Sequence, residues 1–221
     1  MLAVLFDLDG TLADTAPDLA NALNRVLVEN NHCALAYNEI RPVVSHGGIA
    51  LIRLGFKIEP EHPQFEPLHH RLLEIYRQDI CQQTQLFPGL DIVLEQLEKY
   101  NIPWGIVTNK PDWLSKPLLQ QLNLSHRIGS LVCGNTLAEK KPHPAPLFHA
   151  CKEINIDPLQ CIYIGDAARD IEAGKRAGMK TIAAAYGYIE KHDPPENWQA
   201  DKLVEDSTLL WKILKPMLKI G

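Results

Sequence analysis

Short apolar segments alternate with amphipathic ones through most of this chain of 221 residues. Each apolar run ends in polar or glycine-rich residues, a pattern typical of strands buried on both faces of a parallel sheet. We expect such strands at residues 2–6, 102–107, 130–133, 161–164 and 181–185, with an edge strand at 202–204.

The intervening segments show helical periodicity. We expect a helix of about ten residues after the Pro88-Gly89 turn, and others at 115–122, 146–154, 170–177 and 209–220. Strands that alternate with helices of this length form βαβ units with right-handed crossovers. The sequence therefore predicts an α/β protein with a doubly wound, Rossmann-like parallel sheet.

One segment interrupts the alternation. Residues 15–85 contain no convincing strand but show several helical patterns, interrupted as a loop by the prolines at 60, 63 and 67. We interpret this segment as an α-helical cap inserted after the first strand. The chain is expected to leave the core near Asp14 and return near Leu86, which gives a core of residues 1–14 and 86–221 and a cap of residues 15–85.

Composition narrows the possible partners. The net charge is −5 and no basic run is present, so neither nucleic acid nor a membrane is an expected partner. Only six apolar residues precede Asp7, and no run reaches the eighteen or so apolar residues of a spanning helix. The five cysteines and nine histidines show no metal-ligand spacing. We expect a cytoplasmic protein, monomer or homodimer, that acts on a small molecule.

Polar side chains follow four of the expected strands, where open parallel sheets bind ligands. They are Asp7 and Asp9, Thr108 and Asn109, Lys140 and Lys141, and Asp166 and Asp170. Several carboxylates together repel one another unless a cation joins them, and oxygen ligands in this number indicate Mg²⁺. With two carboxylates two residues apart in one turn, one could attack phosphorus while the other protonates the leaving oxygen.

These residues carry a family resemblance. The motifs DLDGT (7–11), TNK (108–110), KPHP (141–144) and GDAARD (165–170) resemble, in order and placement, the four motifs of the haloacid dehalogenase superfamily. The insertion after the first strand is similar to the superfamily's helical cap. Together the four motifs form a specific signal that covers essentially the whole chain.

The resemblance implies a role for each motif residue. Asp7 would be the nucleophile and a metal ligand. Asp9 would be the general acid and later the base, and its backbone carbonyl would bind the metal. Thr108 would hydrogen-bond the phosphoryl group, with Asn109 as a further donor, and Lys141 would stabilise its charge. Asp166 would bind Mg²⁺. Asp170 would hold either the groups around the metal or Lys141 in position.

Simpler interpretations stay open for several of these residues. Asp170 could simply cap the following helix. Lys140 is an alternative to Lys141 as the lysine that binds phosphate, although the following Pro142 matches the family motif and favours Lys141. Arg169 is expected to lie at the surface; alternatively, its side chain could face the cap. Lys110 would either touch substrate or be solvated.

The pair Asp7 and Asp9 argues against dehalogenation, because the dehalogenases lack the second acid. Hydrolysis is favoured, a phosphomutase of the β-phosphoglucomutase type is the alternative, and a non-catalytic binding module ranks below both. The segments DLDGTLADTAPDL, VTNKP, KKPHP and AYGYI are similar to bacterial phosphoglycolate phosphatases. WGIVTNKP and YGYI also resemble N-acetylmuramic acid 6-phosphate phosphatases. Both substrates join a carboxylate to a phosphomonoester.

Substrate choice is expected to lie in the cap. Ser45, His46, Gly47 and Gly48 precede a helical run and could present backbone N–H groups to a carboxylate. Arg53 could add charge nearby. The alternative is that the glycines only make a turn.

Overall fold

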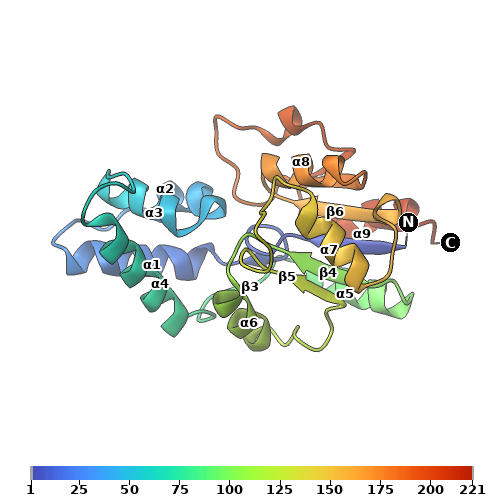
Figure 1. Ribbon diagram of the computed structural model, residues 1–221, viewed down its shortest axis with the longest axis horizontal. Helices are drawn as coiled ribbons and strands as arrows, with labels where there is room; N and C mark the ends of the chain where they lie inside the picture. Colours follow the sequence, from blue (N-terminus) through green and yellow to red (C-terminus); the bar gives the residue numbers. More distant parts are fainter. Residues whose placement is uncertain (1, 221) are drawn as a thin grey trace.

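The computed structural model describes residues 2–220. Its centre is a six-stranded parallel sheet with the order β5-β4-β1-β6-β7-β8 (Figure 1). The strands are β1 (Ala3–Phe6), β4 (Trp104–Val107), β5 (Ser130–Val132), β6 (Cys161–Gly165), β7 (Lys180–Ala184) and β8 (Lys202–Val204). This arrangement confirms the predicted doubly wound α/β fold, and each expected strand is present within two residues of its predicted ends.

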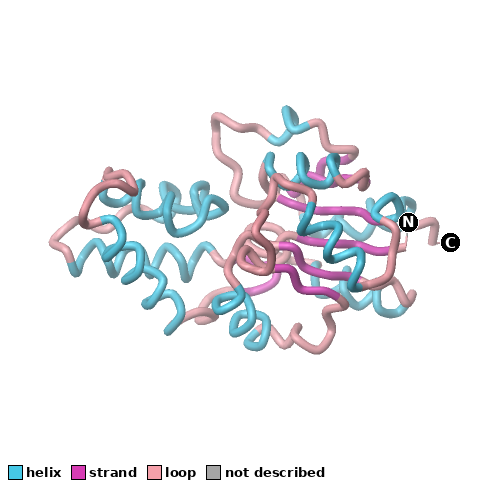
Figure 2. Tube along the Cα trace, viewed as in Figure 1, coloured by secondary structure: helices cyan, strands magenta, loops and turns pink. Residues whose placement is uncertain are grey.

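Helices cover both faces of the sheet (Figure 2). Val4 and Phe6 of β1 belong to a core that includes residues of α5, α6 and α9, whereas Ala3 and Leu5 pack with α7 and α8 on the opposite face. This division follows from the two-residue repeat of a strand. The helices are α5 (Leu90–Lys99), α6 (Asp112–Gln121), α7 (Ala145–Glu153), α8 (Ala168–Arg176) and α9 (Leu210–Met217). Short 3₁₀ turns are η2 (Pro158–Gln160), η3 (Pro195–Trp198) and η4 (Ser207–Leu209).

A helical cap lies beyond one end of the strands (Figure 1). It contains α1 (Ala16–Glu29), α2 (Tyr37–Ile40), η1 (Arg41–His46), α3 (Gly47–Phe56) and α4 (Phe65–Gln78). Two short strands that the sequence did not predict, β2 (Ala13–Asp14) and β3 (Gln85–Leu86), pair antiparallel where the chain enters and leaves the cap. We propose residues 15–85 as the extent of the cap, because both crossings fall within this pair.

The expected loop around the three prolines is shorter than predicted. Helix α4 begins at Phe65, so Pro67 lies inside its first turn. A proline is tolerated there because the first N–H groups of a helix have no partner within the helix. Treating Pro67 as part of the loop was therefore wrong.

Buried polar groups hold the two crossings together. Asp18 of α1 accepts hydrogen bonds from the backbone N–H groups of Gln83 and Thr84 and from the Thr84 hydroxyl, at 2.7–3.1 Å. Tyr188 donates its hydroxyl to Asp14 at 2.8 Å, and the same hydroxyl accepts the N–H of Ala16 at 2.9 Å. Cap and core are thus connected by specific hydrogen bonds as well as by the chain. Over residues 2–220, no helix has the length and apolar character needed to cross a membrane.

Candidate active site

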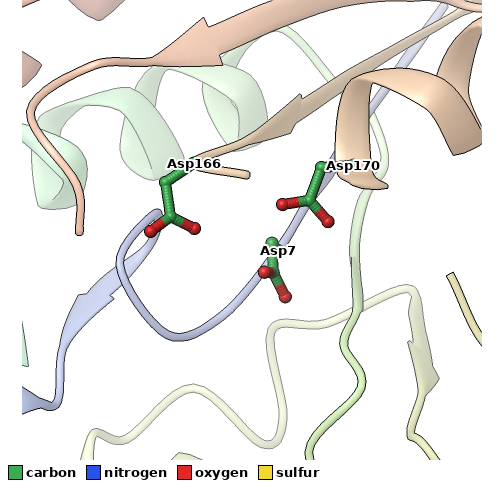
Figure 3. Close-up of side chains that lie close together, drawn as sticks. All are labelled: Asp7, Asp166 and Asp170. Atoms are coloured by element: carbon green, nitrogen blue, oxygen red, sulfur yellow. The ribbon is translucent and has the colours of Figure 1, made fainter. Parts of the chain in front are cut away.

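Three carboxylates converge at the carboxyl end of the sheet (Figure 3). Asp7 follows β1, Asp166 follows the neighbouring strand β6, and Asp170 lies in the first turn of α8. One carboxylate oxygen from each residue lies within 4.8 Å of the others, and all three side chains are buried. Pairing of β1 with β6 is what brings residues so distant in sequence together.

Lys141 is the cation that joins two of these carboxylates. Its ammonium group lies 2.9 Å from Asp7 Oδ1 and 2.8 Å from Asp170 Oδ1, and its side chain is fully buried. It also donates to the hydroxyl of Tyr163 at 2.9 Å, and that hydroxyl donates to the Val107 carbonyl. The structure therefore brings Lys141 to the acid cluster, whereas Lys140 is exposed at the edge of the cavity.

Asp166 has hydrogen-bond donors around it, but no side-chain cation of residues 2–220 contacts it. Thr11 Oγ1, Ser45 Oγ and the N–H of Tyr188 donate to it at 3.2, 2.6 and 3.0 Å. Burial, followed by repulsion from Asp7 and Asp170, raises the pKa of Asp166 to about 7. Burial also raises the pKa of Asp7, although Lys141 opposes it. Lys141 and the more distant Arg169, which also lowers the pKa of Asp7, are two positive charges against three carboxylates, so negative charge remains uncompensated.

The donor set fits a hard divalent cation. Three convergent carboxylates are the oxygen ligands that Mg²⁺ accepts, and the excess negative charge is the charge that such an ion neutralises. Gly10 adds a steric observation: its φ is +82°, and a Cβ there would collide with the Asp166 carboxylate. The loop that follows β1 therefore passes so close to Asp166 that only glycine fits.

The Asp9 side chain turns away from this cluster. Asp9 Oδ1 accepts the hydroxyl of Thr15 at 2.6 Å and the ammonium of Lys110 at 2.8 Å, and Lys110 also donates to the hydroxyl of Tyr76 at 2.9 Å. Burial works against the charge of Lys110, but Asp9 and Tyr76 outweigh it and raise the pKa of Lys110. Because only 7% of the Lys110 side chain is exposed, the solvated interpretation is wrong.

Thr108 and Asn109 follow β4, next to β1 in the sheet. Thr108 Oγ1 accepts the N–H of Lys110 at 3.1 Å, and the hydroxyl group lies at the cavity. Asn109 donates to the backbone carbonyl of Lys141 and accepts its N–H, both at 3.1 Å. Asn109 thus fixes the backbone that carries Lys141, a contact that its predicted role as a donor to substrate did not include.

A cavity of about 400 Å³ opens in front of Asp7, between core and cap. The core contributes Asp9, Thr108, Asn109, Lys110, Lys140 and Arg169. The cap contributes the predicted residues Ser45, His46, Gly47 and Gly48 together with apolar side chains of α1, α3 and α4. The predicted site residues therefore line this cavity or belong to the acid cluster, except Lys141, which contacts two carboxylates of that cluster.

The structure decides between the open interpretations of two arginines. Arg53 is exposed and pairs with Glu59 at 2.6 Å, and it is not among the residues that line the cavity. Arg169 does not lie free at the surface but points toward the cap, where it donates to the Ser45 carbonyl at 2.6 Å. The sequence was compatible with Arg169 at the surface or facing the cap, and its contact with Ser45 shows that it faces the cap.

The fold and site match a known protein family. The family model for the haloacid dehalogenase-like hydrolases matches residues 4–184, most of the chain. The chain therefore belongs to the haloacid dehalogenase-like hydrolase family.

Curated relatives carry two names. An N-acetylmuramic acid 6-phosphate phosphatase of Pseudomonas putida is 43% identical over 98% of this chain and 97% of its own length. A phosphoglycolate phosphatase of Xanthomonas campestris is also 43% identical, over 95% of both chains. A crystal structure of a predicted phosphoglycolate phosphatase from Haemophilus somnus has a TM-score of 0.86 and 28% identity, covering 97% of this chain and 98% of that one. The chain is thus an enzyme whose curated relatives are phosphatases.

Proposed function

We propose that this protein is a Mg²⁺-dependent phosphomonoester hydrolase that acts through an aspartyl-phosphate formed on Asp7. Its substrate would be a small phosphometabolite that also carries a carboxylate, either 2-phosphoglycolate or N-acetylmuramic acid 6-phosphate. The observation that carries the proposal is the position of Asp7, which faces the cavity, is held by Lys141 and lies among the acid cluster.

The chain's own residues supply the nucleophile and the positive charge. Asp7 would attack phosphorus, while Lys141 beside it and Thr108 across the cavity would hold the phosphoryl oxygens. Phosphoryl transfer depends mainly on positioning and charge stabilisation, which a buried lysine and a fixed hydroxyl can provide. Asp170, bonded to the same ammonium group, would keep Lys141 aimed at the phosphoryl group.

Asp9 is the proposed general acid and base. Asp9 follows Asp7 by two residues and also lines the cavity. With Asp7 as the nucleophile, Asp9 is the other acidic residue among the described cavity-lining residues and would face the leaving oxygen. It would protonate that oxygen and then take a proton from the water that hydrolyses the acyl phosphate. The hydrogen bonds from Thr15 and Lys110 hold the Asp9 side chain at the junction of core and cap, where cap movement can reorient it.

Mg²⁺ would be bound by Asp7, Asp166 and the backbone carbonyl of Asp9. Asp170 would support these ligands without being one of them. The ion would neutralise the charge of the carboxylates and of the incoming phosphate dianion. Opening of the cap about the crossings near Asp14 and Leu86 would admit substrate, and closure would exclude water from the leaving group.

The substrate class is inferred from the relatives and from the cavity. The chain is 43% identical to an N-acetylmuramic acid 6-phosphate phosphatase and to a phosphoglycolate phosphatase, so sequence identity does not favour either substrate. Both substrates combine a phosphomonoester with a carboxylate. The predicted loop Ser45, His46, Gly47 and Gly48 lies at the cap side of the cavity, where the part of the substrate beyond the phosphate would rest.

Phosphate release with Mg²⁺ tests the proposal. The panel is 2-phosphoglycolate, N-acetylmuramic acid 6-phosphate, glucose 1-phosphate and an aryl phosphate, with EDTA and Asp7→Asn as controls. We expect one of the two acids to exceed the other esters by at least about a hundredfold in kcat/KM, about 2.7 kcal/mol of discrimination. Wild-type activity in Asp7→Asn, or release from none of these esters, would contradict it.

A further inference from the structure

Arg169 carries a positive charge into the cavity without a carboxylate partner. Across the described part of the chain, no carboxylate lies within ion-pair distance of its guanidinium, and the group lines the cavity. A guanidinium has five N–H donors, of which the structure uses two. Among the described residues, no hydrogen bond uses Nε or the second N–H of either Nη group, so these donors are available to a ligand.

The orientation of Arg169 is fixed from the cap side. Its Nη2 donates to the Ser45 carbonyl at 2.6 Å, and its Nη1 lies 3.4 Å from His46 Nδ1. Because a guanidinium can only donate, His46 Nδ1 must be the acceptor, which places the ring proton on Nε2. His46 Nε2 lies 2.7 Å from Glu190, so the imidazole is held between Glu190 and Arg169. His46, which also lines the cavity, thus positions Arg169.

The phosphoryl group already has its own cation. Lys141 contacts Asp7 directly at 2.9 Å, whereas Arg169 acts on the same carboxylate only through its charge, and the cluster itself fits a metal ion. Arg169 lies instead with Ser45, Gly47 and Gly48, at the beginning of α3, where the backbone also favours negative charge. A planar guanidinium with free donors beside that helix end suits a carboxylate, which it can bind with two parallel hydrogen bonds.

We propose that Arg169 binds the carboxylate of the substrate and is the residue that separates acidic phosphomonoesters from neutral ones. This inference rests on the proposed phosphatase function and assigns the second anionic group of the substrate to the core helix α8. Ser45, His46 and Glu190 act as positioning residues for Arg169. Closure of the cap therefore completes the carboxylate site, because Ser45 and His46 orient Arg169 only when cap and core are in contact.

Two matched substrate pairs test the inference. The first pair is 2-phosphoglycolate and 2-hydroxyethyl phosphate, and the second is N-acetylmuramic acid 6-phosphate and N-acetylglucosamine 6-phosphate. Each pair differs in the carboxylate-bearing group, so the ratio of kcat/KM within a pair measures carboxylate recognition. In the pair that contains the natural substrate, we expect Arg169→Gln to lower this ratio about 100-fold, Arg169→Lys to lower it less, and the control Arg53→Gln to leave it unchanged.

The outcomes separate the inference from the proposed function. If Arg169→Gln lowers activity on both members of a pair equally, Arg169 serves the phosphoryl group or cap closure and the inference is wrong. An unchanged ratio in a variant with wild-type Tm also overturns it. If the wild type releases phosphate from none of the four esters, the proposed function fails. The inference is then tested by the rise in Tm that each ester causes with Mg²⁺, and it is overturned if Arg169→Gln does not lessen the preference for the acids.

Discussion

Replacing Asp166 with asparagine should stabilise the metal-free protein at neutral pH. Asp166 is buried, contacts no side-chain cation in the part of the chain that the structure describes, and lies within the acid cluster beside Asp7 and Asp170. Asparagine has nearly the same shape, and its carbonyl oxygen can still accept from the N–H of Tyr188 and the hydroxyl of Ser45. The substitution therefore removes a repelled charge while the hydrogen bonds can be kept.

The magnitude follows from the pKa. With a pKa of about 7 in the folded protein against 3.8 in the unfolded chain, the folded state holds a proton that the unfolded state has lost. Stability therefore falls as pH rises between these two values, and the full cost is present above pH 7. We expect Asp166→Asn to add about 4 kcal/mol to the free energy of unfolding at pH 8, or about 8–16 °C in Tm, and almost nothing near pH 4.

Urea unfolding of EDTA-treated protein between pH 4 and pH 8 measures this difference directly. Asp91→Asn, at an exposed aspartate of α5, is the matched control and should show no growing difference from the wild type. Equal or lower stability of Asp166→Asn at pH 8 would show that the Asp166 carboxylate is compensated. The charge argument for a metal at this site would then be refuted.

Four further expectations follow from the same contacts. Mg²⁺ at 100 times its Kd should raise the free energy of unfolding of the wild type by about 2.7 kcal/mol but leave the Tm of a variant without a site ligand unchanged, as differential scanning fluorimetry can check. Lys141→Met leaves the carboxylates of Asp7 and Asp170 buried without their cation, so we expect a loss of about 3–5 kcal/mol at pH 8 in metal-free urea titrations and no detectable phosphate release. Gly10→Ala should cost more than about 1 kcal/mol and weaken Mg²⁺ binding measured by calorimetry, because the new Cβ displaces a metal ligand. Asp18→Ala removes the acceptor that holds the return crossing, and limited proteolysis should cut faster near residue 83, with a stability loss of about 1–3 kcal/mol; an unchanged cleavage rate would mean that this acceptor does not hold the crossing.

The sheet was predictable because buried parallel strands appear in sequence as uninterrupted apolar runs. Five of the six strands lie at such runs, whereas the edge strand β8 (Lys202–Val204) has only two consecutive apolar residues. Strands β2 and β3 were not predictable, since two residues carry no periodicity and their partners lie 71 and 73 residues apart in the chain. Pro67 misled the prediction because a proline tolerated in a first turn looks the same in sequence as a helix breaker.

The acid cluster was predictable for a topological reason. Strand ends in one parallel sheet share an edge, so Asp7 and Asp166 had to meet once β1 and β6 were neighbours. The contacts between cap and core were not predictable from the sequence, because they depend on how the cap packs against the core. Ser45 on Asp166 and Tyr76 on Lys110 are examples.

Tyr163 could have been noticed in advance. It is the polar residue in an otherwise apolar strand run, and a buried tyrosine hydroxyl needs a partner. Its partners, the Lys141 ammonium and the Val107 carbonyl, lie on loops and strands that only the folded sheet brings together. Arg169 gave a weaker signal, because an arginine before a motif aspartate is equally compatible with the surface and with the cap.

Acid-quenched turnover tests the central claim most directly. Asp9→Asn, in which loss of the general base slows hydrolysis of the acyl phosphate, is mixed with Mg²⁺ and the preferred substrate, quenched in acid, digested and analysed by mass spectrometry. We predict that the peptide containing Asp7 carries one phosphoryl group, and that Asp7→Asn carries none and releases no phosphate. Phosphate release by Asp7→Asn at the wild-type rate, or a phosphoryl group found on another residue, would contradict Asp7 as the nucleophile.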